Sequence, residues 1–236
     1  MSLLTDALRE AVAPLGLSLT EKQYAAFDTY YEMLVDWNSR MNLTAITDPV
    51  EVAQKHFADS LLPLAYGMLP ERARCIDVGT GAGFPGVPLL IARPDLSMVL
   101  LDSLAKRLKF LDAVLSALSL KARTVHARAE EGGRLSGLRA GFDAVLSRAV
   151  APAPVLLELT IPFARVGGAS ICFKGPALSE ELDSAKRALT LLSARVDRVE
   201  TLLLPWGERR IARIEKTAKT PPAYPRKPGA PSKQPL

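Results

Sequence analysis

The feature that most constrains the fold is the alternation of short apolar runs with helix-forming segments from Arg74 onward. The first five runs are separated by segments long enough for crossover helices, which predicts a mostly parallel sheet with helices on both faces. Only Pro205 to Glu208 join the last two runs, so these are expected to form an antiparallel hairpin. The predicted fold is therefore α/β, with seven candidate strands: Cys75–Val78, Met98–Leu101, Ala122–His126, Phe142–Ser147, Ala169–Phe173, Val196–Leu204 and Arg209–Ile214.

Helical patterns dominate residues 1–70, which we expect to pack on a domain spanning residues 71–215. A short amphipathic helix within residues 2–19 precedes a longer one, for which Thr20 and Gln23 are a candidate capping box. Asp48 and Pro49 are typical of a further helix start, and this helix is expected to continue to about Tyr66. The long helix carries a stripe predicted to be core: Tyr24, Phe27, Tyr31, Leu34 and Trp37.

The C-terminal residues 216–236 have a different composition. They contain six prolines and five Lys or Arg residues but no acid, a mixture that cannot build a core. We interpret this segment as an extended basic tail, with a disordered end that has no task as the alternative.

Composition limits the class of protein. With 236 residues, 48% of them hydrophobic, the chain is long enough for one buried α/β domain and an extra helical segment. The only two cysteines, Cys75 and Cys172, both lie in strand-like runs, so neither a disulfide framework nor a Cys-rich metal site is predicted. This cysteine usage predicts a cytoplasmic location. The N-terminal stretch is not expected to be a signal peptide, and no apolar run is long enough to predict a membrane span. The net charge of +5 is compatible with RNA, but equally with a merely solvated basic surface.

A glycine-rich loop follows the first predicted strand. Gly79, Gly81 and Gly83 lie between that strand and a helix beginning near Pro85, where glycine permits positive φ and close approach of a ligand. The free N–H groups at the start of this helix are expected to favour a carboxylate.

An acid, Asp102, stands at the end of the second predicted strand. It is placed to accept both hydroxyls of a ribose, or to cap a helix beginning at Leu104, and the two roles are compatible. Together with the glycine loop, it predicts a nucleoside-containing cofactor. Gly81, Gly83 and Gly86 also fit the dinucleotide fingerprint, but Asp77 before the loop and the terminal hairpin favour a methyltransferase over a nicotinamide enzyme.

Several ordered motifs together resemble one family, the ribosomal RNA small subunit methyltransferases G. The motifs are Trp37-Asn38, Asn42-Leu43-Thr44, His56 with Asp59-Ser60, Asp77 to Gly86, Asp102-Ser103, Ser147-Arg148-Ala149 and Lys174-Gly175. The resemblance implies a Rossmann-like class I methyltransferase with a helical N-terminal extension. It implies transfer of a methyl group from S-adenosylmethionine to nitrogen 7 of a guanine in 16S ribosomal RNA. The implied substrate is that RNA or the small ribosomal subunit, and a monomer is expected.

The resemblance also implies site residues. Cofactor contacts carried over by position are Gly79, Phe84, Asp102, Ser103, Leu104, Ala129, Glu130 and Arg148. Arg148 is expected near the cofactor carboxylate or the base and Lys174 near the RNA backbone, with two charges at the sheet margin as the alternative. His56 is expected to be a packing residue. No catalytic residue is assigned, because N7 of guanine has a free lone pair and needs no general base. Two rival hypotheses remain, a nicotinamide oxidoreductase and a non-enzymatic RNA-binding module.

Overall fold

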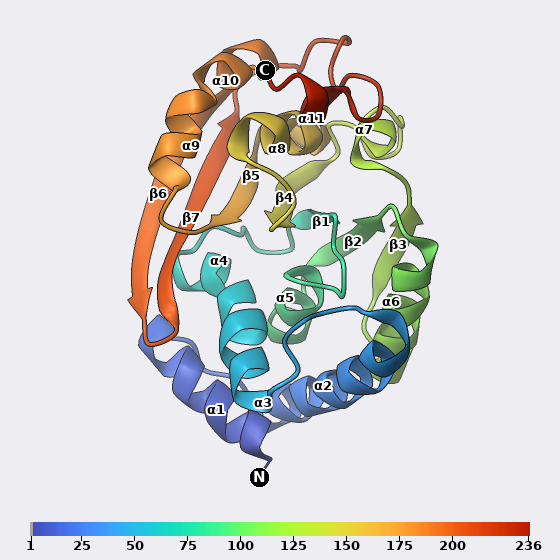
Figure 1. Ribbon diagram of the computed structural model, residues 1–236, viewed down its shortest axis with the longest axis vertical. Helices are drawn as coiled ribbons and strands as arrows, with labels where there is room; N and C mark the ends of the chain where they lie inside the picture. The colour runs from blue at the N-terminus through green and yellow to red at the C-terminus, as the bar shows by residue number, and fades with distance from the viewer. Residues whose placement is uncertain (1) are drawn as a thin grey trace.

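The computed structural model describes residues 2–236, and its centre is one seven-stranded sheet in the order β3-β2-β1-β4-β5-β7-β6 (Figure 1). The strands are β1 (Arg74–Val78), β2 (Ser97–Asp102), β3 (Ala122–His126), β4 (Phe142–Arg148), β5 (Ala164–Lys174), β6 (Ala194–Leu204) and β7 (Gly207–Lys216). Strands β1 to β5 are parallel, and β7 is antiparallel to both β5 and β6. The predicted parallel sheet with its terminal hairpin is confirmed.

The strand order creates a crevice beside the glycine loop. The chain moves outward from β1 through β2 to β3, then returns to place β4 on the other side of β1. At such a switch point the connections after neighbouring strands leave in opposite directions, so ligands bind there at the carboxyl ends of the strands. The ends of β1, β2 and β4 therefore position the candidate site.

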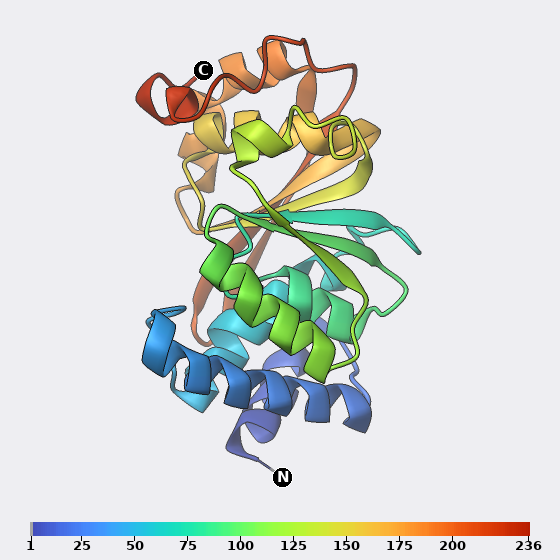
Figure 2. The same cartoon turned by 90° about the vertical axis from the view of Figure 1, so that its right-hand side faces the viewer.

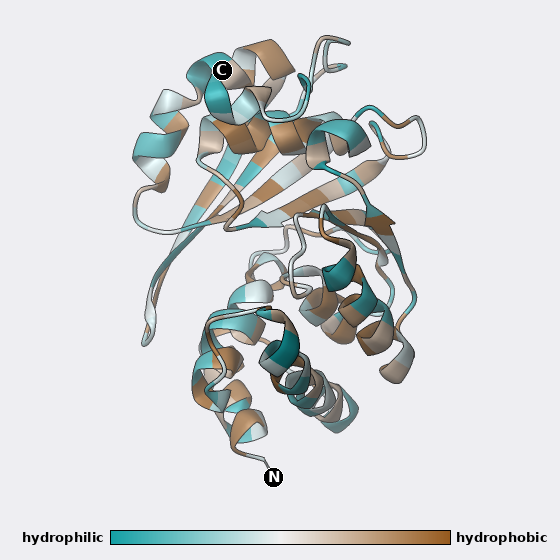
Figure 3. Cartoon of the chain, turned by 45° about the vertical axis from the view of Figure 1, so that its right-hand side comes forward, coloured by the Kyte–Doolittle hydropathy of each residue, from teal (hydrophilic) through white to brown (hydrophobic). Residues whose placement is uncertain are grey.

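Helices cover both faces of the sheet (Figure 2). One face carries α5 (Gly86–Ala92) and α6 (Ala105–Ala117), with the N-terminal helices packed beyond them. The other carries α7 (Ala129–Gly132), α8 (Ala153–Thr160), the 3-10 turn η3 (Ile161–Phe163), α9 (Leu178–Ser184) and α10 (Lys186–Leu192). Successive residues of β1 point to opposite faces, so Cys75 packs in the first core and Ile76 in the second. Figure 3 shows the resulting apolar colouring of the strands and of the helix faces toward them.

The N-terminal region is helical as predicted, but more broken. Its elements are α1 (Leu3–Val12), the 3-10 turn η1 (Ala13–Leu15), α2 (Glu21–Met41), α3 (Pro49–Glu51), the π-helical segment η2 (Val52–Ala58) and α4 (Leu62–Ala65). The Thr20–Gln23 capping box and the Asp48 cap are both present. The single helix predicted to run to about Tyr66 is wrong, because the backbone passes through the π segment before α4.

Two predictions about helices need correction. Tyr31 and Trp37 are only partly buried, whereas Tyr30, outside the predicted stripe, is fully buried and donates a hydrogen bond to the Ala82 carbonyl oxygen. Leu104, where the next helix was expected to begin, is instead the N-cap residue before α6, and its side chain is 41% exposed.

The tail, residues 217–236, is not a freely extended segment. It crosses the second face of the sheet over α7 and α8 and contains the short helix α11 (Ala230–Lys233) (Figure 2). Arg139 donates to the carbonyl oxygens of Thr220, Pro221 and Tyr224 at 2.8–3.3 Å. Prolines leave carbonyl oxygens without adding donors, so the neighbouring domain supplies the donors here. The tail packs on the domain's core instead of forming one.

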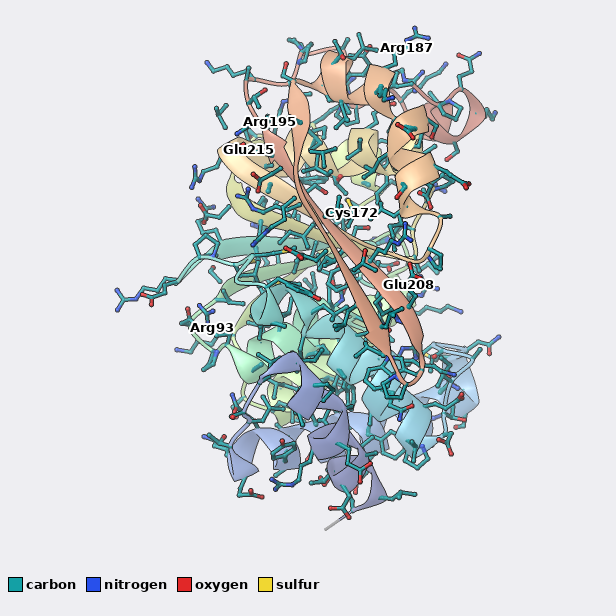
Figure 4. The ribbon with its side chains drawn as sticks, turned by 90° about the vertical axis from the view of Figure 1, so that its left-hand side faces the viewer. Arg93, Cys172, Arg187, Arg195, Glu208 and Glu215 are labelled. Atoms are coloured by element: carbon teal, nitrogen blue, oxygen red, sulfur yellow. The ribbon has the colours of Figure 1, made fainter. Side chains whose placement is uncertain are left out.

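The β6–β7 hairpin forms the edge of the sheet opposite β3. Arg195 and Glu215, which are labelled in Figure 4, are paired across β6 and β7 and form a 2.6 Å ion pair. Among residues 2–236, none of the helices is both long and apolar enough to cross a membrane.

Candidate functional site

The glycine loop follows β1 and bends tightly toward α2. Gly79, Gly81 and Gly83 have φ of 73°, 60° and 101°, as the sequence predicted. A Cβ at Gly83 would lie 2.6 Å from the Tyr30 hydroxyl oxygen, so only glycine lets the loop pass this side chain. The loop is tied to β2 by the Gly79 and Thr80 N–H groups, which donate to the Leu101 carbonyl oxygen.

Asp77 occupies the position that the sequence suggested for a cofactor carboxylate. Its Oδ2 accepts hydrogen bonds from Thr80 Oγ1 at 2.7 Å and from the Gly86 N–H at the start of α5 at 2.9 Å. Burial raises the pKa of this carboxyl to about 6, and the two hydrogen bonds act against that rise. The prediction that this helix start is free for a ligand carboxylate is therefore wrong, because the protein's own acid already binds there.

Asp102 connects the loop with α6. Its carboxylate is 2% exposed; Oδ1 accepts from the Leu104 N–H at 2.8 Å and Oδ2 from the Gly81 N–H at 2.9 Å. Arg107 Nη1 lies 3.4 Å from Oδ2. The predicted capping role is wrong, because α6 begins at Ala105 and has no side-chain capping hydrogen bond; Asp102 instead binds the N–H of the N-cap residue Leu104. The ribose-binding role stays a prediction that is compatible with these bonds, since a carboxylate has further lone pairs to offer.

A pocket of about 360 Å³ opens at the ends of β1, β2 and β4, and we call it the donor pocket. It is lined by Val78, Gly79, Leu101, Asp102, Ser103, Arg107, Ala127, Arg128, Ala129, Glu130, Arg148, Ala149, Val150, Ala151, Leu159 and Ser232. Of the predicted cofactor contacts, all but Phe84 and Leu104 lie in this lining. Phe84 is instead 7% exposed and packs against the His56 and Tyr30 rings, with centroids 4.5 and 5.6 Å away.

The donor pocket suits an adenosine-containing cofactor. Its volume is in the range of small-ligand pockets, and Asp102 lies beside glycine backbone at one wall. A Cβ at Gly79 would lie 2.9 Å from a Val150 methyl group, so glycine lets the loop backbone and Val150 lie close together at this wall of the pocket. Buried Asp77 Oδ1 has no hydrogen-bond partner within the described part of the chain, which leaves acceptor capacity under the loop.

Arg148 lines the donor pocket, but its guanidinium is hydrogen-bonded to η2; the expectation that it lies near the cofactor carboxylate or the base stays a prediction. Its Nη1 donates to the carbonyl oxygens of Lys55 at 3.1 Å and His56 at 3.4 Å, both in η2. Its Nη2 lies 3.3 Å from His56 Nδ1, and the guanidinium stands 5.1 Å from the Phe84 ring centroid. Burial lowers the pKa of this guanidinium. Arg148 therefore braces η2 while lining the donor pocket.

A second, larger pocket lies on the far side of Arg148, and we call it the cationic pocket. It measures about 560 Å³ and is lined by Ile46, Lys55, His56, Asp59, Leu62, Arg148, Ala149, Phe173, Lys174, Gly175, Pro176, Glu208, Arg209 and Arg210. Arg148 and Ala149 belong to both linings, so the two pockets meet there. Lysines and arginines outnumber acids in this lining, which suits a polyanion.

Asp59 and His56 shape the cationic pocket. Asp59 accepts from Trp206 Nε1 at 2.8 Å and from Arg209 Nε at 2.6 Å; burial raises its pKa, and these two donors lower it. His56 Nε2 lies 2.8 Å from Thr44 Oγ1, and burial, followed by the Arg148 charge, lowers the imidazole pKa to about 4. A neutral, doubly hydrogen-bonded imidazole agrees with the predicted packing role.

Two lining residues of the hairpin were missed. Arg209 and Arg210 follow the β6–β7 turn, next to Glu208, which is labelled in Figure 4, and Arg210 Nε pairs with Glu208 at 2.6 Å. Two adjacent arginines are a signal for an anion-binding surface, but both fall within the predicted strand Arg209–Ile214. Lys174, predicted near the RNA backbone, does line this pocket, where Nζ donates to Glu181 and to the Ala151 carbonyl oxygen at 2.6 Å. Among residues 2–236 there is no cluster of three or more His, Cys, Asp or Glu residues suited to a metal ion.

Solved structures share this fold. A proposed O-methyltransferase from Klebsiella pneumoniae superimposes with a TM-score of 0.58 at 13% identity, over 90% of this chain and 97% of its own. A proposed methyltransferase from Bacillus halodurans gives 0.53 at 11% identity, over 68% of this chain and all of its own. At such identities the likeness establishes the fold alone.

Sequence comparison is more specific. The family model described as rRNA small subunit methyltransferase G matches residues 23–211. Proteins named ribosomal RNA small subunit methyltransferase G are similar over most of their length. The one from Geobacillus thermodenitrificans is 47% identical over 94% of both chains, and the one from Desulforamulus reducens is 43% identical over the whole of both. By this match along nearly its full length, the chain belongs to the rRNA small subunit methyltransferase G family.

Proposed function

We propose that this protein transfers a methyl group from S-adenosylmethionine to nitrogen 7 of a guanine in 16S ribosomal RNA. The observation that carries the proposal is the meeting of the donor and cationic pockets at Arg148 and Ala149. A cofactor in one and a nucleotide in the other approach each other at this boundary. Such an arrangement favours group transfer between them by proximity and orientation.

On the donor side, four of the predicted contacts that line the pocket have tasks that their surroundings support. Asp102 binds the ribose hydroxyls, Ala129 and Glu130 contact the adenine, and Gly79 lies against the remainder of the cofactor. The bound cofactor supplies an electrophilic sulfonium methyl group. Asp102 is held in place by two backbone N–H donors, so little reorganisation is needed when the ligand binds.

On the acceptor side, the pocket's cations recognise RNA. Guanine presents O6 and N7 as acceptors, and phosphates carry negative charge, so Lys174, Arg209 and Arg210 match both kinds of group. N7 attacks through its lone pair without losing a proton. His56 therefore maintains the shape of the boundary through Thr44 and Arg148 instead of accepting a proton.

The decisive experiment is methyl transfer from labelled S-adenosylmethionine to small ribosomal subunits from cells lacking this protein, with the product mapped by mass spectrometry. One 7-methylguanine in 16S RNA is the expected result. Methylation of another base or atom would refute the proposed target. A nicotinamide enzyme would instead be stabilised more by a dinucleotide in a thermal-shift comparison, and a binding module would bind RNA without responding to the donor.

We also propose that the protein acts as a monomer in the cytoplasm, where its substrate is assembled. Both pockets are lined by one chain, so a partner copy is not needed to complete either. Light scattering of the purified protein is expected to give the mass of a single chain.

A further inference from the structure

An ion pair fixes the path of the tail. Glu158 of α8 is fully buried, and its Oε1 accepts from the Arg226 backbone N–H at 2.7 Å, while its Oε2 accepts from Arg226 Nη2 at 2.6 Å. The same Nη2 donates to the Gln234 carbonyl oxygen at 2.8 Å. A buried carboxylate without its partner is strongly unfavourable, so this pair holds residues 226–234 against the domain.

A second anchor lies at the donor pocket itself. The Gly229 N–H donates to Glu130 Oε1 at 2.9 Å, and Glu130 is one of the predicted adenine contacts. Gly229 has a φ of 80°, and the turn it makes leads directly into α11. Ser232 of α11 then lines the donor pocket, on the same side as Val150 and Ala151. The tail thus both engages a pocket residue and supplies one.

We propose that the tail is a wall of the methyl-donor site, with Ser232 against the bound donor and Arg226 as the positioning residue that holds it there through Glu158. The inference rests on the proposed function, since it takes the donor pocket as the S-adenosylmethionine site. Gly229 also fixes the orientation of the Glu130 carboxylate beside the adenine.

Charge separates this role from simple attraction of RNA by a basic tail. The Arg226 guanidinium is neutralised by Glu158, whereas the adjacent Lys227 is exposed and has no part in the anchors. An RNA-attracting tail depends more on Lys227 than on Arg226. A tail that forms the donor wall depends on Arg226 and Ser232.

The test is calorimetric binding of S-adenosylmethionine and S-adenosylhomocysteine to the full-length protein and its Arg226→Met variant. We expect the variant's Kd for both ligands to rise about tenfold, because the wall loses its fixed position. The KM for the donor rises with it, while the KM for small ribosomal subunits stays unchanged. Arg226→Lys keeps one charged donor to Glu158 and is expected to recover part of the affinity.

Ser232→Phe provides a second test, independent of folding, because Ser232 is exposed and outside the core. The larger side chain enters the pocket, so donor affinity falls while the ligand-free melting temperature is unchanged. Lys227→Ala is the matched control and is expected to bind the donor as the wild type does.

Wild-type donor affinity in both Ser232→Phe and folded Arg226→Met would overturn the inference. Should Arg226→Met unfold, Ser232→Phe alone decides it. Asp102→Ala distinguishes a failure of the tail's role from a failure of the donor-pocket assignment. If Asp102→Ala weakens donor binding and the tail variants do not, only the tail's role is lost; if Asp102→Ala binds the donor normally, the donor pocket itself is misassigned.

Discussion

The donor pocket and the cationic pocket share a boundary but differ in how they are built. The donor pocket takes most of its lining from short stretches directly after β1, β2, β3 and β4, all at one edge of the parallel sheet. The cationic pocket combines η2, the ends of β4 and β5, and the β7 side of the hairpin turn. Asp59 and Arg209, which pair at 2.6 Å, are 150 residues apart in sequence.

This difference separates two tasks. The donor pocket presents fixed acceptors and backbone to one small cofactor, so a few glycines and acids suffice. The cationic pocket presents positive side chains to a large polyanion, and its lining comes from distant parts of the chain. Variants in one pocket should therefore alter donor affinity or RNA affinity separately, except at Arg148, where both should respond.

The largest effect on the rate of methyl transfer is expected at this shared residue. Arg148→Met removes the guanidinium that braces η2 from β4, so we expect methyl transfer to fall about 100-fold, corresponding to ~3 kcal/mol for lost charge-assisted hydrogen bonds. Initial rates with labelled donor and small ribosomal subunits measure this. Arg148→Lys retains the charge without the forked geometry, so its rate of methyl transfer should lie between those of the wild type and Arg148→Met. A rate close to wild type in Arg148→Met would contradict the idea of a shared brace.

Asp102→Ala should break the donor pocket alone. We expect donor affinity to weaken by roughly 1.5–3 kcal/mol, the range for hydrogen bonds to a charged group, or about 10- to 150-fold. Calorimetry with S-adenosylmethionine measures the change, while binding of small ribosomal subunits stays constant. Asp102→Asn preserves the shape and one acceptor, so it should be affected less. Unchanged donor affinity in the alanine variant would mean that the donor pocket is misassigned.

Arg210→Ala should affect the cationic pocket alone. We expect weaker RNA binding, with the slope of log affinity against log salt reduced by about 0.7–0.9 for one lost phosphate contact. Filter binding at several salt concentrations gives this slope, and donor affinity should not change. Arg213→Ala is the matched control, because Arg213 lies on the same strand but pairs with Asp197 and lines neither pocket. Equal slopes for the two variants would exclude a specific role for Arg210.

The smallest effect is expected in the pH dependence of stability. The pKa of His56 is lowered to about 4 in the folded protein from 6.5, so between these values the unfolded state binds more protons and stability falls as pH falls. Asp77 acts with opposite sign: its pKa is raised from 3.8 to about 6, so it contributes stability as pH falls through that interval.

His56→Gln removes the first contribution and leaves the second. Urea unfolding at pH 7.5 and 4.5 should therefore show that the wild type loses more stability on acidification than the variant does. The free energy of unfolding, extrapolated to water, is the quantity to compare. A larger loss in His56→Gln than in the wild type would mean that His56 is charged in the folded protein.

Much of the sheet and donor pocket could be predicted because their signals are local. All seven strands, the hairpin, the Thr20 capping box and the positive φ of the loop glycines follow from patterns a few residues long. Parallel strands bring their carboxyl ends to one edge, so Gly79, Asp102 and Glu130 are placed together once the strands are known. Their roles toward the cofactor stay predictions.

Tertiary structure decided the rest, because long-range partners leave no local pattern. Asp77 accepts a hydrogen bond from the Gly86 N–H that was expected to bind a ligand, and Arg148 donates to η2. Phe84 packs against the His56 ring. A proline-rich tail with no core of its own is bound by donors and by a buried carboxylate of the neighbouring domain. Sequence by itself determined the periodicity, and hence the sheet and its loop. Only packing decided which polar groups satisfy one another and which remain to bind a ligand, because a buried polar group takes whichever partner the fold brings within reach.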